Sequence, residues 1–347
     1  MKKHRFLLIA AASVMLLLLI FPGQAKSAAA DALRMCGMTL VPSLFPFYVA
    51  ADLFLAAGLP PAGKRLDAVM RRLFGLPGEA APALLLGLLG GYPIGASVTA
   101  GLYRQGVLTK QEAVTLSRFS NNAGPAFIIG AAGLAVFQSV KLGLLLYAIH
   151  AASAVITGIL LREKNDSHIR KRRMTQTQSG SITQALPEAV SAAAQSMLMI
   201  CAYVVFFSVV LAVIRAFPPV GHLFSVVSNR LPVCEAALSG IAELSCGILA
   251  LQGAPRFSAL VTASVLLGWG GICVFFQSAS VLSAAGLPVK QCIKGKLTQA
   301  GIAGALSCAC CAAASHSGSF FLGFSVFLLI SLCICKIGGR KAVSRLI

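Results

Sequence analysis

The sequence predicts an all-α, polytopic membrane protein. Hydrophobic residues make up 57% of the 347 residues and charged residues only 11%, whereas soluble chains carry about 25% charged residues. Apolar stretches of about 20 residues recur from end to end, and each is long enough to cross a hydrocarbon core roughly 30 Å thick. Glycine and proline interrupt several of these stretches. This composition excludes an ordinary soluble domain.

The net charge of +19 has a distribution typical of membrane proteins. Basic residues gather in short segments between apolar stretches, as the positive-inside rule expects. Because no basic helix with interleaved aromatic residues is present, we do not expect nucleic-acid binding. The cysteine cluster Cys308–Cys311 has no second pair or histidine at ligand spacing, so no metal site is expected. Without a Walker A motif or a nucleophile–base pair, the sequence predicts neither an enzyme nor a cofactor.

The basic segments divide the chain. We expect residues 1–35 to form an N-terminal span, Phe6–Pro22, and a linker; a cleaved signal peptide is the alternative. A basic cytoplasmic linker at 162–186 separates a first repeat, 36–161, from a second repeat, 187–316. A C-terminal span and basic tail, 317–347, complete the chain, and this scheme places both termini in the cytoplasm.

Each repeat contains a segment too interrupted to be a simple span. Three apolar stretches lie between two basic cytoplasmic segments, the first with Lys64, Arg65, Arg71 and Arg72 and the second the linker at 162–186, so one stretch must enter and leave on the same side. Ala81–Tyr103, with "GGYPIG" at its centre, suits a re-entrant hairpin because glycine and proline break the helix. Cys234–Leu251 predicts a second hairpin, which enters from the opposite side.

A discontinuous helix is predicted after each hairpin, at "SNNAGP" (Ser120–Pro125) and at "GWGG" (Gly268–Gly271). The separation of the two anchors Gly91 and Asn121 equals that of Gly240 and Gly270. Opposed hairpins with discontinuous helices in corresponding positions predict an inverted-repeat transporter, whose solute site lies near the bilayer midplane.

The first break offers groups that suit an anion. Pro125 can start a half-helix that Ser120, Asn121 and Asn122 could cap. The N-terminus of such a half-helix attracts anions, and Arg118 adds a full charge. The alternative is that the asparagines cap a cytoplasmic helix end and Arg118 snorkels to the interface.

The second half offers an acid. Glu243 would lie deep at the hairpin tip, where it could bind a proton or cation or accept a hydrogen bond; otherwise it is an exposed loop acid. Tyr92 could stack on a planar ring or merely pack. The predicted substrate-binding residues are Tyr92, Arg118, Ser120, Asn121, Asn122, Gly124, Glu243, Ser245, Gly270 and Gln277. The predicted structural breaks are Gly90, Gly91, Pro93, Pro125, Gly240, Gly268 and Gly271.

Three motifs together carry a family resemblance: "LLLGLLGGYPIGA", "LTKQEAVTLSRFSNNAGPAFIIGA" and "GWGGICVFFQ". From about Met38 onward the chain resembles the sporulation integral membrane protein YlbJ family, whose members look like distant relatives of nucleoside-recognition (Gate) domains and concentrative nucleoside transporters. The resemblance implies a protein of the outer forespore membrane that transports dipicolinic acid from the mother cell. The second half does not repeat the asparagine pair, so no transporter contact map is carried over.

The sequence therefore favours a transporter of a small planar anion, dipicolinate above all, that works by alternating access within the lipid bilayer. A nucleoside or neutral-solute permease is one alternative, and a membrane scaffold for spore assembly is another. Homo-oligomerisation and contacts with other sporulation membrane proteins are compatible with each of the three.

Overall fold

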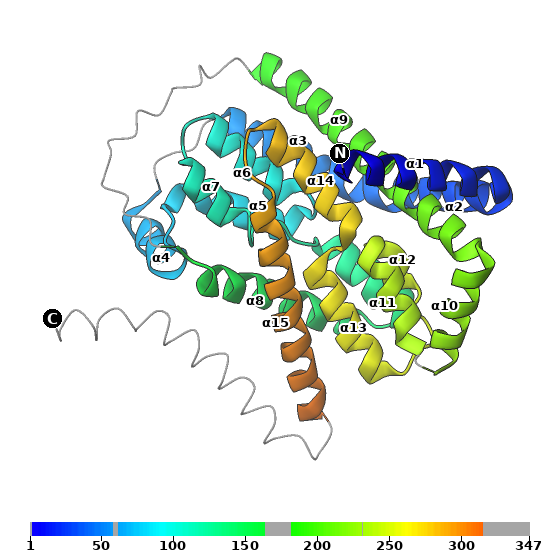
Figure 1. Ribbon diagram of the computed structural model, residues 1–347. Helices are drawn as coiled ribbons and strands as arrows, with labels where there is room; N and C mark the ends of the chain where they lie inside the picture. Colours follow the sequence, from blue (N-terminus) through cyan, green and yellow to red (C-terminus); the bar gives the residue numbers. More distant parts are fainter. Residues whose placement is uncertain (1, 58–61, 164–181, 231, 315–347) are drawn as a thin grey trace.

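The computed structural model describes residues 2–57, 62–163, 182–230 and 232–314, and in these ranges it is all-helical with no strands (Figure 1). The predicted all-α class is confirmed. The predicted C-terminal span and tail, 317–347, and most of the basic linker lie outside the described residues.

The helices fall into two series, one on each side of the basic linker. The first series is α1 (Lys2–Ile20), α2 (Pro22–Met35), η1 (Cys36–Leu40), α3 (Val41–Ala56), α4 (Lys64–Phe74), η2 (Gly78–Ala80), α5 (Ala81–Gly90), α6 (Ile94–Arg104), α7 (Lys110–Leu116), η3 (Ala126–Val136) and α8 (Val140–Leu160). The second series is α9 (Ile182–Ala216), α10 (Pro218–Arg230), α11 (Pro232–Ala242), α12 (Leu244–Leu249), α13 (Arg256–Trp269), α14 (Gly271–Ala284) and α15 (Lys290–Ala314).

Four helices among the described residues are long and apolar enough to cross a membrane: Pro22–Ala56, Val140–Leu160, Thr183–Ala216 and Arg256–Ala284. α4 and the following Gly78–Gly90 would form a fifth span, although they are bent by 80°. The chain is therefore an integral membrane protein with several candidate spans.

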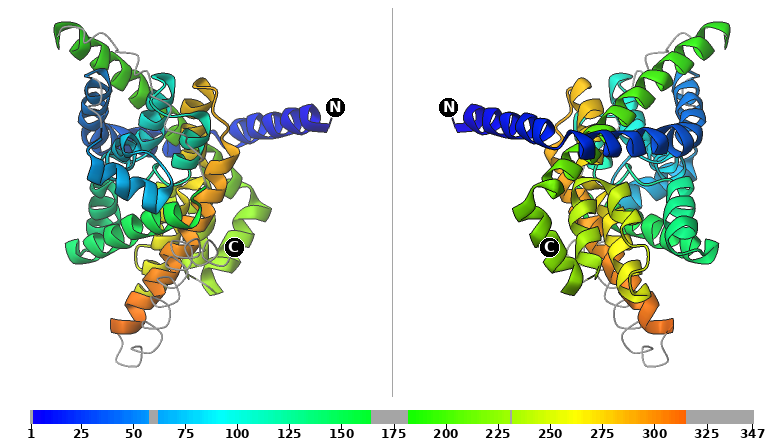
Figure 2. Two further views of the ribbon diagram at one scale, coloured as in Figure 1. Left: turned by 90° about the vertical axis from the view of Figure 1, so that its left-hand side faces the viewer. Right: turned by 90° about the vertical axis from the view of Figure 1, so that its right-hand side faces the viewer.

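The N-terminal region differs from the expected span and linker. α1 is a shorter apolar helix that projects from the body (Figure 2). Residues 22–35, treated above as linker, form α2 and continue without interruption through the π-helical turn η1 into α3. The alanine-rich sequence of α2 explains this, since alanine has the highest intrinsic helix propensity.

Each segment predicted to be a re-entrant hairpin forms a pair of packed helices, and re-entry into the membrane stays a prediction. α5 and α6 meet at Gly91–Pro93, and a methyl group at Gly87 would lie only 2.9 Å from the Gly95 Cα atom. α11 and α12 approach even more closely, because a methyl group at Gly247 would lie 2.2 Å from the Gly240 Cα atom. Their entry from opposite sides of the membrane stays a prediction.

Both predicted breaks are present too. Residues 117–124 separate α7 from η3, and η3 begins directly after Pro125. Gly270, with a left-handed φ of 85°, separates α13 from α14.

In each half the break packs against the tip of the preceding helix pair. A methyl group at Gly91 would lie 3.1 Å from the Gly124 nitrogen, and one at Gly271 would lie 3.2 Å from the Gly240 oxygen. Only residues without a Cβ atom allow backbones to approach so closely.

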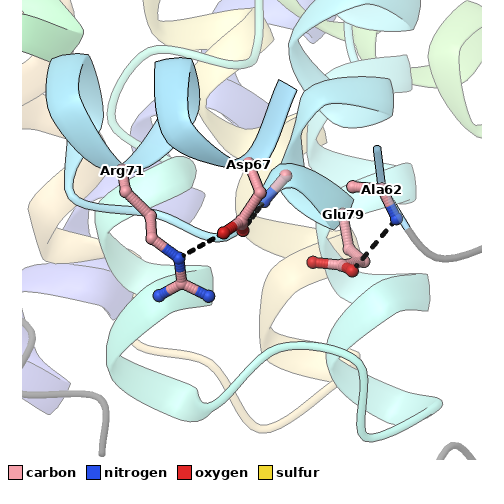
Figure 3. Close-up of polar contacts among 5 residues, drawn as sticks. Ala62, Asp67, Arg71 and Glu79 are labelled. Carbon is pink, nitrogen blue, oxygen red and sulfur yellow. Dashed lines mark hydrogen bonds and ion pairs between the residues drawn. The ribbon is translucent and has the colours of Figure 1, made fainter. Parts of the chain in front are cut away.

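Polar contacts fix the base of the first pair (Figure 3). Arg71 Nε donates to Asp67 Oδ2 at 2.7 Å, and the Gly78 amide donates to Asp67 Oδ1 at 2.9 Å. The Ala62 amide donates to Glu79 Oε1 at 3.3 Å. These bonds hold the connection between α4 and α5.

The two halves are joined by helix packing. α9 packs along α2 and α3, α14 packs against α6, and α15 packs against α8. α15 also packs along α13, so it lies between the two series and contacts both (Figure 1). This arrangement places the two breaks around the middle of the molecule.

Candidate solute-binding site

Side chains satisfy the backbone freed at the first break. Asn122 Nδ2 donates to the Phe119 carbonyl at 2.8 Å, and the Ala123 amide donates to His150 Nε2 at 3.0 Å. Since Nε2 of His150 accepts this bond, the neutral imidazole carries its proton on Nδ1. A break inside a membrane survives only with such partners. The expected capping is wrong, because no side chain caps the N-terminus of η3.

Arg118 is buried, but it does not face the break. Its Nη2 pairs with Glu163 Oε1 at 2.5 Å, and its Nη1 donates to the Leu161 carbonyl at 3.0 Å. The hydrogen bond from Arg118 lowers the pKa of the Glu163 carboxyl below its ordinary value. Arg118 is thus neutralised beside the C-terminus of α8, where a cation is favourable. It neither snorkels nor lines the cavity described below.

Lys296 of α15 occupies the position expected for Arg118. Its ammonium donates to the Asn121 carbonyl and to Gln299 Oε1 at 2.9 Å, and it lies 4.9 Å from the centre of the Tyr92 ring. Among the described residues, no carboxylate oxygen lies within 4.0 Å of it. A buried lysine without a counter-ion is costly, and in membranes such a group marks a functional site.

The surrounding polar network joins the two halves. Gln299 Nε2 donates to Asn122 Oδ1 at 2.9 Å, and Asn121 Nδ2 donates to Ser278 Oγ at 2.6 Å. The Tyr92 hydroxyl donates to the Leu267 carbonyl at 2.8 Å. We call this group the lysine cluster; its members are Tyr92, Asn121, Asn122, Ser278, Lys296 and Gln299.

A central cavity lies between the tips of the two helix pairs. Its volume is about 60 Å³. Gly90–Tyr92 line it from the first tip, Glu243–Ser245 from the second, Ala123 and Gly124 from the break, and Gln277 from α14. A smaller cavity of about 10 Å³, beside Lys296, shares the wall residue Val274 with it.

Glu243 is buried at the second tip and is not an exposed loop acid. Only 2% of its surface is accessible, and its Oε2 accepts a hydrogen bond from the Cys246 amide at 2.7 Å. This bond makes Glu243 the N-cap of α12. The same carboxylate lines the central cavity.

Most of the predicted site residues come together here. Those that line the central cavity are Tyr92, Gly124, Glu243, Ser245 and Gln277. Asn121 and Asn122 belong to the lysine cluster, and a methyl group at Gly270 would lie 3.2 Å from the Tyr92 hydroxyl. Ser120 does not line this cavity; its Oγ lies 3.1 Å from Oγ1 of Thr99 on α6.

Sequence reasoning missed His150, Ser278, Lys296 and Gln299. In the sequence Lys290, Lys294 and Lys296 form a short basic segment typical of a cytoplasmic loop, but α15 begins at Lys290 and Lys296 is buried. The available signal was helical spacing: Lys296 and Gln299 are three residues apart and share one helix face.

These features define a class, a polytopic helical membrane protein with a buried polar site between two helix pairs. No protein-family model matches the chain, and no solved structure matches it. The chain is 25% identical over 307 residues to the sporulation integral membrane protein YlbJ of Bacillus subtilis, with 80% of this chain and 75% of the relative covered. This similarity supports membership of the YlbJ family, as the motifs predict. The relation to nucleoside-recognition domains stays a prediction.

Proposed function

We propose that the protein is a sporulation-associated transporter that moves a small planar anion, dipicolinic acid above all, from the mother cell across the outer forespore membrane. The name of the Bacillus subtilis relative supports the link to sporulation. Dipicolinate and the outer forespore membrane enter through the family resemblance. The site supports transport of an anion.

One observation carries the proposal: the Lys296 ammonium is buried between two interrupted segments and lies on the Tyr92 ring, with no carboxylate within 4.0 Å in the described part of the chain. A solute carboxylate would supply the missing counter-charge and form a charge-assisted hydrogen bond. Tyr92 lines the central cavity and contacts Lys296. A rotation of the Tyr92 side chain would therefore expose the ammonium to a solute in that cavity.

The size of the central cavity supports alternating access. Its volume of about 60 Å³ is well below the roughly 300–1,000 Å³ of pockets that enclose small molecules. Binding therefore requires the two helix-pair tips to separate.

A second candidate is a permease for nucleosides or other neutral solutes. Among the described residues that line the central cavity there is a carboxylate, Glu243, and no cation. An ionised Glu243 would repel an anion. A neutral polar solute could instead donate a hydrogen bond to Glu243 and accept one from the Gln277 amide.

Uptake of labelled dipicolinate by the purified, reconstituted protein tests the proposal. We expect uptake above that of empty liposomes, and we expect Lys296→Met to reduce it by roughly tenfold or more because the counter-charge is lost. Lys294→Met is the matched control, since Lys294 lies on the same helix and is exposed. Equal uptake by Lys296→Met and the wild type would contradict the assigned site. Counterflow driven by uridine but not by dipicolinate would favour the second candidate.

A further inference from the structure

Three cavities follow one another along a single helix, α9. A cavity of about 260 Å³, which we call the glutamine cavity, is lined by Gln195, Ser196, Ile200 and Tyr203 of α9. The central cavity is lined by Ile200 and Val204. A cavity of about 250 Å³, which we call the arginine cavity, is lined by Ser208, Leu211, Ala212 and Arg215. Most of these positions recur every three or four residues and so form one helical stripe.

The polar residues of α9 follow the same stripe. Between Ala192 and Ala216 the polar side chains other than cysteine are Gln195, Ser196, Tyr203, Ser208 and Arg215. All five line either the glutamine cavity or the arginine cavity. In a membrane helix, polar side chains face the protein interior or a water-filled space because lipid offers them no partners.

Another face of α9 is different in character. It lines an apolar groove of about 470 Å³ against α1 and α2, formed by residues such as Leu18, Leu198 and Phe206, with no charged side chain. Leu198 is 71% exposed and Phe206 is 54% exposed. This face is suited to lipid, which makes the polarity of the cavity stripe a specific feature.

Thin barriers separate the central cavity from its neighbours. Ile200 and Gln277 line both the glutamine cavity and the central cavity. On the other side, Cys246 lines the arginine cavity, and its backbone amide donates a hydrogen bond to Glu243, which lines the central cavity. Ser208 Oγ lies 3.7 Å from Cys246 Sγ at this second barrier.

The stripe is long enough to cross the bilayer. From Ala192 to Arg215 an α-helix rises about 35 Å, at about 1.5 Å per residue, compared with a hydrocarbon core of roughly 30 Å. Arg215, which lines the arginine cavity, forms an ion pair with Glu235. The central cavity thus lies between two larger spaces that reach toward opposite ends of α9.

We propose that this stripe of α9 is one wall of an aqueous permeation route, in which the glutamine and arginine cavities are the two vestibules of the central cavity. Only the solute of this route, a small hydrophilic molecule, depends on the proposed function. Ile200 with Gln277 forms one gate, and Ser208 with Cys246 forms the other. Alternating access then consists of opening one of these barriers at a time.

Cysteine accessibility in the full chain tests the route without knowledge of the solute. Native cysteines are replaced, single cysteines are introduced, and a membrane-impermeant methanethiosulfonate with a quaternary ammonium group is applied from each side of proteoliposomes. The route positions are Ser196, Ile200, Val204, Ser208 and Leu211, and the controls on the apolar face are Leu198 and Phe206. Only variants that elute from a size-exclusion column as one symmetric peak, and are therefore folded, are compared.

We expect the route positions to react roughly tenfold or more faster than the controls, because the reactive thiolate forms in water and not in lipid. Ser196→Cys should react from one side and Leu211→Cys from the other. Equal rates at Ser196, Leu211 and the two controls would overturn the route and show that lipid fills these spaces. If labelling follows the stripe while dipicolinate uptake is absent, the route stands and the anion proposal fails.

Discussion

Lys296 shows how one buried charge can be held ready for a ligand. Its ammonium has donors directed at the Asn121 carbonyl and the Gln299 amide oxygen, and its positive charge lies on the face of Tyr92. Neutral acceptors and a cation–π contact, worth about 2 kcal/mol when desolvated, reduce the cost of burial without cancelling the charge. The remaining attraction is available to an anion.

Arg118 and Glu163 illustrate the opposite case, a charge that is satisfied within the protein. We predict that Glu163→Gln destabilises the protein at neutral pH, because Arg118 loses its ion-pair partner. An acid whose pKa is lowered by folding stabilises the fold above its ordinary pKa, and this contribution is lost as the pH falls through the lowered pKa. Thermal unfolding is measured in detergent from neutral pH to about pH 3. The difference between the unfolding midpoints of the wild type and the variant should become smaller as the pH falls. A gap independent of pH would contradict this assignment.

The sequence could not distinguish Arg118 from Lys296. Both are basic residues beside apolar segments, and charge counting favours the cytoplasm for either. Their roles depend on where the adjoining helices lie: Leu161 and Glu163 reach Arg118, whereas α15 begins early enough to carry Lys296 into the protein. Glu243, Asn121 and Tyr92 were predictable because they lie at glycine or proline breaks in apolar sequence.

At the scale of elements, each interrupted helix packs closely against a helix pair at glycine residues. Gly87 and Gly95 both face the Ser120 carbonyl, and a methyl group at either would lie 1.9 Å from its oxygen. Gly295 of α15 faces the Arg118 carbonyl in the same way. The first break is thus enclosed by glycines on two sides.

We predict that Gly87→Ala lowers the stability of the protein by about 1–3 kcal/mol, because the backbone at Ser120 must move. The matched control is Gly301→Ala in α15, where a methyl group has no neighbour within 4 Å. That change should raise the stability by about 0.5–1 kcal/mol, since alanine favours a helix more than glycine does. Midpoints of thermal unfolding in detergent measure both. If the unfolding midpoint changed in the same direction in both variants, the close approach at Gly87 would not be a constraint.

The interruptions could be predicted from the sequence, but the element boundaries could not. Glycine and proline within apolar stretches indicate breaks directly. By contrast, α2 lacks the apolar character of a span and forms a helix that packs on α9, while the start of α15 carries lysines that resemble a loop. Tertiary packing decides such segments.

At the scale of the whole molecule, the chain combines two series of helices that share the order helix pair, interrupted helix, long helix. The lysine cluster joins them, since Asn121 belongs to the first series and Ser278 and Lys296 to the second. The opposite orientation of the two series was predicted from charge alone and stays a prediction.

In sporulating cells, we predict that Lys296→Met lowers the dipicolinate content of spores severely while the protein still reaches its membrane. The reason is that a methionine fills a similar volume without the charge, so packing survives and anion binding does not. Dipicolinate assay of purified spores, with immunoblotting of membranes, measures both. Normal dipicolinate content, together with normal protein level, would favour the scaffold alternative.

Equilibrium binding of labelled dipicolinate to the purified protein tests the central claim most directly, because it needs no membrane gradient. The account predicts saturable binding to the wild type and to Lys294→Met, and an affinity at least about tenfold weaker for Lys296→Met, the loss expected when a charge pair worth 1.4 kcal/mol or more is removed. Equal affinity of the wild type and Lys296→Met, or no binding to the wild type, would contradict a solute site built on Lys296.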